Sequence, residues 1–148
     1  YIRWLGVACI FFFLSIDETA LFHERATHLF RRFVEVSRFG LSHSAWTIPY
    51  LALVLAVSIV YWRFFFRLPG KTRRGLATGA VLYVTGAIGM EWVSCIWLDV
   101  SSRDYVFYLL ATGEELLEMI AVIVMIHALA CHLDRYHSDL SFKISSVP

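Results

Sequence analysis

The sequence places seven acidic residues inside or beside stretches that are otherwise strongly apolar. The first stretch ends in LSIDETALFHE, residues 14–24, and two later ones contain AIGMEWVSCIW and YLLATGEELLEMI. An ionised carboxylate at mid-bilayer costs roughly 2.5–3.5 kcal/mol even on the lenient insertion scale, so such residues face a bundle interior and usually mark function. The seven acids are Asp17, Glu18, Glu24, Glu91, Glu114, Glu115 and Glu118.

Helical spacing and chain connectivity predict that these acids meet. Asp17 and Glu24 share one helical stripe with His28, while Glu114 and Glu118 are i, i+4 partners. In a four-span bundle the first and third connections lie on one side. Helix rise puts Glu91 of the third span about 10 Å from that side, and Glu114 of the fourth span about 14 Å from it. The acids therefore fall in one leaflet.

Like charges this close cannot all ionise in a low dielectric, so protons, an arginine or a metal must lie among them. Carboxylates from several helices, with an imidazole, suit iron, manganese or zinc. The sequence therefore predicts a metal site. The predicted ligands are Asp17, Glu24, Glu91, Glu114 and Glu118 with His23 or His28, surrounded by Glu18, Glu115 and Arg25.

Three readings of the acids stay open. The first is the metal site, although it is not a standard di-iron site. The di-iron carboxylate bundles use Glu-x-x-His pairs, and neither Glu24 with His28 nor Glu18 with His23 has that spacing. A hydrogen-bonded network that only fixes helix order is the structural alternative. A proton relay is a third, although no aligned acids continue into the other leaflet. If the chain is an enzyme, we expect metal-activated water or oxygen to act on a lipid-soluble substrate.

The elements that must position these residues are membrane helices. Of the 148 residues, 59% are hydrophobic and only 17% are charged, whereas a soluble domain is about a quarter charged. Four apolar runs are long enough to cross about 30 Å of hydrocarbon. We predict an all-α integral membrane four-helix bundle, a single domain over residues 1–133, followed by a short polar tail over 134–148. The predicted spans are Ile2–Phe22, Trp46–Phe66, Gly75–Leu98 and Tyr105–Leu133.

Two further features concern packing. The connection RATHLFRRFVEVSRFG, residues 25–40, alternates apolar and basic residues at helical spacing, which predicts a short amphipathic helix in the interface that ends at Gly40. Gly75 and Gly79 form a small-xxx-small pair, so the third span is expected to pack closely on a neighbour.

Charge distribution indicates orientation and excludes one class of partner. A net charge of +1 gives no case for nucleic acid. Summing Lys and Arg by side, the positive-inside rule favours both termini and the second connection, RFFFRLPGKTRR, in the cytoplasm. The three cysteines are far apart and form no CxxC pair, so neither a disulfide framework nor a thiolate metal site is indicated.

A rival class is a non-catalytic accessory subunit of a larger energy-transducing or photosynthetic complex. Aromatic residues make up 16% of the chain, and the triplets Phe11–Phe13 and Phe64–Phe66 are expected to expose rings around a helix. Such rings, with the Gly75/Gly79 patch, suit contact with another membrane subunit, or with pigment or quinone carried by a partner. In that case the acidic cluster is structural.

The segment FLSIDETALFHE together with GEELLEMIAVIVMIHALA resembles a group of uncharacterised bacterial multi-pass membrane proteins. Their S-x-DE-x(4)-HE segment is matched by Ser15, Asp17, Glu18, His23 and Glu24. Their EE-x-x-EM helix is matched by Glu114, Glu115, Glu118 and Met119, with Glu91 on the span between. The resemblance covers about three of the four spans. It implies a bacterial cytoplasmic membrane protein in which these acids belong together, and it implies no particular reaction.

Overall fold

The computed structural model describes residues 2–22, 25–26, 45–101 and 104–136. All regular secondary structure in these ranges is helical. The elements are α1 (Ile2–Ala20), α3 (Thr47–Arg67), α4 (Gly70–Val84), the π-helix η1 (Thr85–Met90), α5 (Glu91–Val100) and α6 (Tyr105–Tyr136). Since α4, η1 and α5 follow one another without a break, they form one long rod.

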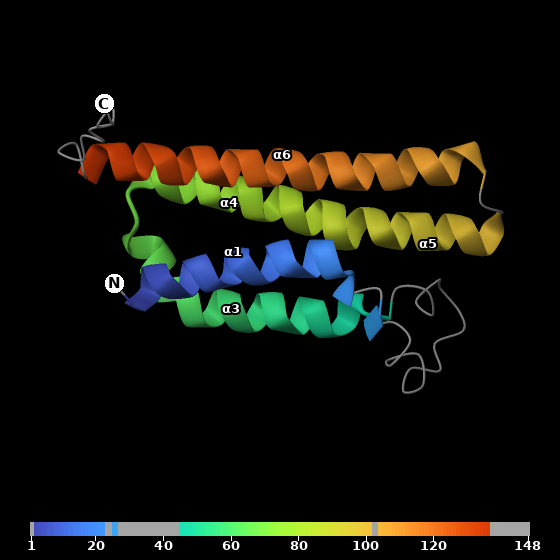
Figure 1. The fold of residues 1–148 in the computed structure, drawn as a ribbon, viewed down its shortest axis with the longest axis horizontal. Helices are drawn as coiled ribbons and strands as arrows, with labels where there is room; N and C mark the ends of the chain where they lie inside the picture. The colour runs from blue at the N-terminus through green and yellow to red at the C-terminus, as the bar shows by residue number, and fades with distance from the viewer. Residues whose placement is uncertain (1, 23–24, 27–44, 102–103, 137–148) are drawn as a thin grey trace, which may run out of the picture.

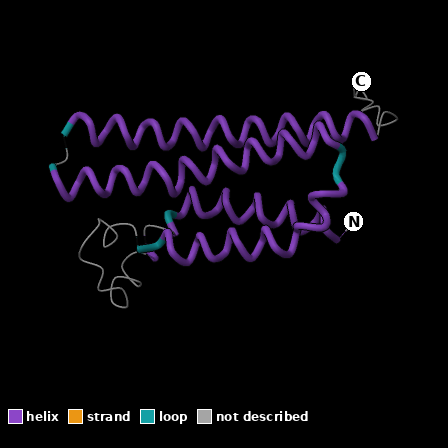
Figure 2. Tube along the Cα trace, turned by 180° about the vertical axis from the view of Figure 1, so that it is seen from behind, coloured by secondary structure: helices purple, strands orange, loops and turns teal. Residues whose placement is uncertain are grey.

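The rods form two antiparallel pairs that lie side by side (Figure 1). One pair is α1 with α3, and the other is the α4–η1–α5 rod with α6. The view from behind shows the same arrangement and the short link between α3 and α4 (Figure 2). The end of α1, the start of α3, α5 and the start of α6 all lie toward one end of the molecule (Figure 1).

Three of the rods are long and apolar enough to cross a membrane. They are Thr47–Arg67, Gly70–Leu98 and Tyr105–Arg135, and they indicate a membrane protein. Helix α1 is not among them, because its 19 residues include Arg3, Asp17 and Glu18. The predicted fourth span over Ile2–Phe22 therefore remains a prediction, although the segment is helical as far as Ala20.

The helix ends differ from the predicted spans at two places. Helix α4 begins at Gly70 rather than Gly75, so the basic residues Lys71, Arg73 and Arg74 lie at its start and not in a connection. The reason is Pro69, which precedes the helix with ψ 143° and ends the extended link, since proline is well placed at a helix start. Helix α6 runs on to Tyr136. Within the predicted interfacial helix only Arg25 and Ala26 are described, and residues 27–40 and the tail from 137 lie outside the described ranges.

The close packing predicted for Gly75 and Gly79 is confirmed, and the neighbour is α6. A Cβ added at Gly75 would lie 2.6 Å from Cβ of Ala128. One added at Gly79 would lie 2.9 Å from the carbonyl oxygen of Ala121 and would overlap Met125. The absent side chains let the two backbones approach, which is how membrane helices associate without a hydrophobic driving force.

Aromatic contacts join the two pairs at the end opposite the acids. The Trp4 ring of α1 packs edge-on against Phe64 of α3, with centroids 5.1 Å apart. Trp4 also lies 5.0 Å from the His132 ring of α6. His132 Nδ1 is in turn 3.3 Å from the hydroxyl of Thr72 on α4. These contacts join α1 to α3 and α6, and α6 to α4, at the end opposite the acids.

Candidate functional site

Asp17 is the buried residue of α1, and its side chain is only 6% exposed. The Tyr50 hydroxyl of α3 donates to Asp17 Oδ1 at 2.6 Å. That length lies at the short end of the usual range for O–H···O hydrogen bonds. The bond ties α1 to α3 at the level of the acids.

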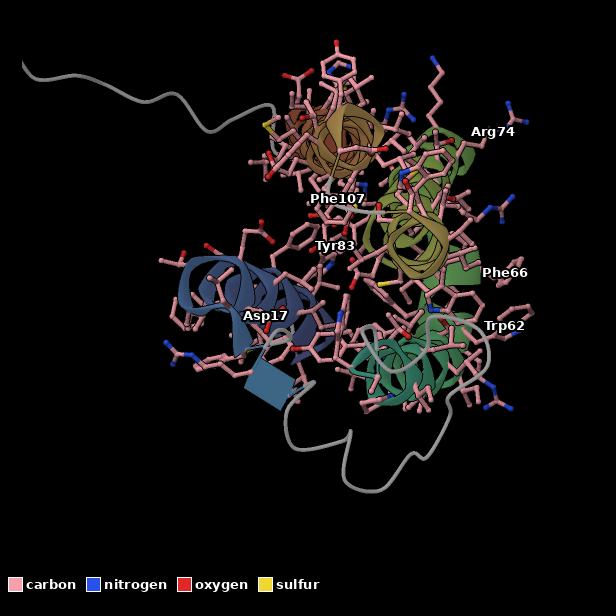
Figure 3. All side chains as sticks on the ribbon, turned by 90° about the vertical axis from the view of Figure 1, so that its right-hand side faces the viewer. Asp17, Trp62, Phe66, Arg74, Tyr83 and Phe107 are labelled. Atoms are coloured by element: carbon pink, nitrogen blue, oxygen red, sulfur yellow. The ribbon has the colours of Figure 1, made fainter. Side chains whose placement is uncertain are left out.

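Tyr83 of α4 connects the two helix pairs. It lies in the space between α1, α4 and α6 when the molecule is viewed along its helices (Figure 3). Its hydroxyl is within electrostatic reach of Glu118 on α6, of Glu18 and Asp17 on α1, and of Tyr50 on α3. A single phenol therefore stands among ionisable groups from three other helices.

Glu114 of α6 stands among other carboxylates. It is within electrostatic reach of Glu91 on α5, of Glu18 on α1, and of Glu118 and Glu115 on its own helix. Glu114 and Glu118 are half-buried, whereas Glu115 is exposed. The i, i+4 pair thus turns toward the interior, and Glu115, about 100° further round the helix than Glu114, does not turn with it.

Glu91 is fixed by two donors to the same oxygen. Trp46 Nε1, just before α3, donates to Glu91 Oε1 at 3.2 Å, and Cys95 Sγ approaches that oxygen at 3.7 Å. A second bond runs between the same two helices, from Trp92 Nε1 to the Thr47 hydroxyl at 2.9 Å. Two adjacent residues of α5 thus pair with two adjacent residues at the start of α3, which fixes the register of Glu91.

The π-helix η1 lies directly before Glu91. In it the backbone bonds run from i to i+5, and such segments are found frequently at functional sites. Its Gly86 is buried, and an added Cβ would meet Glu118 Cγ at 3.1 Å and the carbonyl oxygen of Glu114 at 3.2 Å. The missing side chain therefore leaves room for the acid-bearing turn of α6.

The structure gathers part of the predicted ligand set. Asp17, Glu91, Glu114 and Glu118 converge from three helices, with Glu18 nearby. Among the residues that the structure describes, no three His, Cys, Asp or Glu side chains are placed to hold one metal ion. The predicted ligands His23, Glu24 and His28 lie outside the described residues, and Arg25 is exposed.

The sequence did not identify three side chains of this region, Trp46, Tyr83 and Cys95. Trp46 opens the predicted second span, and it is only 6% exposed because it reaches inward to Glu91. Tyr83 and Cys95 were not singled out. The available signal was spacing, since Cys95 follows Glu91 by one helical turn and therefore shares its face.

Asp104 accepts hydrogen bonds at the start of α6. It accepts from Trp97 Nε1 at 3.0 Å, from the Phe107 backbone N–H at 3.1 Å and from the Ser101 hydroxyl at 3.3 Å. These donors favour the ionised form, so the pKa of Asp104 lies below its usual value of 3.8, with the Trp97 bond as the largest cause. The carboxylate closes the turn between α5 and α6 and caps the orphan N–H groups of the first turn.

Because the folded pKa of Asp104 is lowered, its contribution to stability is present above the ordinary pKa and is lost as the pH falls through the folded value. We expect Asp104→Ala to lower the melting temperature in detergent at about pH 7, and the difference from the unaltered chain to shrink below about pH 4. Asp104→Asn can still accept a hydrogen bond at this cap and should recover part of the loss. A difference that stays constant across this pH range would contradict the capping role.

Comparison of the sequence with known protein families assigns the chain to one of them. Residues 1–133 match the model of a domain of unknown function, DUF8692. The chain belongs to this family. The matched region contains every carboxylate of the cluster together with Trp46, Tyr50 and Tyr83, so the DUF8692 domain carries the whole candidate site. No curated protein matches the chain. No solved structure matches it either.

Proposed function

We propose that this chain is a membrane protein whose carboxylate cluster binds a metal cation, with iron, manganese or zinc as the candidates. The proposal includes four membrane spans with α1 as the first, an interfacial helix after it, and the cluster within the non-cytoplasmic leaflet. It also places both termini in the cytoplasm of a bacterial cell, following the positive-inside rule and the resemblance described above.

The observation that carries the proposal is the surroundings of Glu114. This carboxylate is half-buried, and four other carboxylates lie within its electrostatic reach. Among the described residues it accepts no hydrogen bond and forms no ion pair. Like charges in a low dielectric disfavour one another, so a cation beside Glu114 would lower the cost of burying this carboxylate.

The donor chemistry supports a hard or borderline metal. Carboxylate oxygens from three helices supply the hard ligands, and His23 and His28 follow Glu18 by five and ten residues in the sequence. The hydroxyls of Tyr50 and Tyr83 lie among the carboxylates and can donate to their oxygens. Such outer partners orient metal ligands and tune their basicity. If the site is catalytic, water or oxygen activated there acts on a substrate that enters from the lipid.

Elemental analysis of the purified full-length protein tests this proposal. We expect iron, manganese or zinc at about one equivalent or more per chain. The double variant Glu114→Gln/Glu118→Gln should fall below about a tenth of that content, since amides are weaker ligands. Asp134→Asn, an exposed change in the last turns of α6, is the matched control and should keep the metal. A metal-free unaltered protein, or equal metal in both variants, would refute the site.

A second candidate function is that of an accessory subunit, and the outward faces favour it. Phe12, Phe13 and Phe66 are 69%, 41% and 50% exposed. Other large apolar side chains on α3 are exposed as well. The triplets were expected to expose rings around a helix, and within the second triplet Phe64 packs against Trp4 and Tyr61. The exposed rings would contact a partner span, or pigment or quinone carried by it.

Gentle solubilisation in mild detergent separates the two functions. Co-migration with a large membrane assembly supports the subunit. Elution as a monomer or homodimer that retains its metal argues against it.

A further inference from the structure

A groove opens at the end of the molecule opposite the acids, between the first turns of α4 and the last turns of α6. It has a volume of about 470 Å³. Toward the middle of the spans its wall is mostly small or apolar, with Gly75, Val124 and Ala128 beside the His127 ring and Cys131. Its outer part is polar and includes Lys71, Thr72 and Arg135. The groove is therefore apolar toward the middle of the two spans and cationic at their ends.

The two cations of the groove are not engaged elsewhere. Lys71 and Arg135 are exposed, and neither forms an ion pair or hydrogen bond with any residue in the described ranges. Arg73 does not compete for this role, because its guanidinium lies 5.5 Å over the Phe66 ring and donates to the Phe66 carbonyl. Arg74 points outward from α4 (Figure 3). Asp134 also lines the groove, so the three charged lining side chains sum to a net positive charge.

The start of α4 adds further donors to the groove. Pro69 is the N-cap residue of α4 and supplies no side-chain cap, so the N–H groups of the first turn have no side-chain acceptor. Their dipole favours an anion at this place. The free N–H groups and the two cations lie at the same rim, since Lys71 and Thr72 belong to that first turn.

The position of the groove selects the kind of anion. It lies where Gly70–Leu98 and Tyr105–Arg135, two rods fit to span a membrane, reach their ends. This is the level of lipid phosphates, and basic pockets between membrane helices bind anionic headgroups. The apolar inner wall suits the first part of an acyl chain, which a free phosphate lacks.

We propose that this groove binds the phosphate of an anionic phospholipid, with Lys71 and Arg135 contacting the headgroup and an acyl chain lying along Val124 and Ala128. The site is separate from the carboxylate cluster, and it does not depend on a metal there.

The test is lipid binding to the purified full-length protein in a non-ionic detergent, followed by native mass spectrometry. Short-chain phosphatidylglycerol is compared with phosphatidylcholine of the same chains. We expect the anionic lipid to bind at least about tenfold more tightly, from about 1 kcal/mol per basic residue near the surface. Lys71→Ala/Arg135→Ala should remove this preference. Arg63→Ala/Arg74→Ala is the matched control, since it removes the same charge from exposed residues that do not line the groove.

Glycerol phosphate and inorganic phosphate serve as competitors without acyl chains. We expect both to displace the bound lipid only at concentrations at least about tenfold higher than those at which the short-chain lipid displaces it. The reason is that they have no acyl chain to contact the apolar wall. Equal affinity for the two lipids would overturn the proposal. So would an equal loss in both double variants, or competition by inorganic phosphate as strong as by the lipid. The comparison of the two lipids on the unaltered chain stands whether or not a variant folds.

Discussion

Replacing Trp46 with alanine will lower the free energy of unfolding by about 3–5 kcal/mol, the usual cost of deleting a buried aromatic side chain. Trp46 is 6% exposed, packs edge-on against Tyr50 with ring centroids 5.1 Å apart, and donates to Glu91. The change therefore leaves a cavity and also removes a hydrogen bond to the half-buried Glu91. Unfolding by denaturant in mixed micelles, followed by circular dichroism, measures the loss.

Trp62 provides the control for this prediction. It has the same side chain and lies on α3, the helix that Trp46 precedes, but it is 61% exposed, and its ring centroid lies 4.5 Å from that of Phe66. Trp62→Ala should cost less than about 1 kcal/mol. Trp46→Phe keeps most of the ring and removes the N–H, so it isolates the Glu91 bond at about 1–3 kcal/mol. Equal losses at Trp46 and Trp62 would show that Trp46 has no special role in the bundle.

The helices could be predicted from the sequence because apolar runs of this length have few alternatives. α3 and α6 begin within a residue of the predicted spans, and the Gly75/Gly79 pair identified a close helix contact correctly. The start of α4 was predicted five residues too late, because Lys71, Arg73 and Arg74 resemble a loop when only charge is considered. Pro69 was the better signal, since it marks a helix start regardless of the charges that follow.

The grouping of the acids could be predicted in outline, but their individual orientations could not. Depth along a helix follows from counting residues, and this placed Glu91 and Glu114 at one end of the bundle. Orientation needs helical phase, which changes at the π-helix before Glu91 without any strong sequence signal beyond Gly86 and Gly89. The partner of Glu91 could not be read either, because Trp46 lies 45 residues away and meets it only through tertiary packing.

The hydrogen bond between Tyr50 and Asp17 provides a way to separate stability from metal binding. Asp17→Asn removes the charge but keeps an oxygen that can accept from Tyr50, so we expect stability to change by less than about 1 kcal/mol. Metal affinity should nevertheless fall at least about tenfold, because a ligand has lost its charge. Tyr50→Phe keeps the charge and removes the donor. It should cost about 1.5–3 kcal/mol, the range for hydrogen bonds to charged groups, and leave the ligand in place.

Opposite responses of the two variants are the decisive result. If the cluster only fixes the packing of α1 against α3, the two variants differ in stability but not in metal content, because the unaltered protein binds no metal either. If the cluster is a metal site, Asp17→Asn yields a stable protein with little metal, and Tyr50→Phe yields a less stable protein that keeps more of its metal than Asp17→Asn does. Tyr108→Phe, an exposed change on α6, controls for the loss of a phenol and should alter neither quantity. Denaturant unfolding and elemental analysis of the same preparations decide between the two roles.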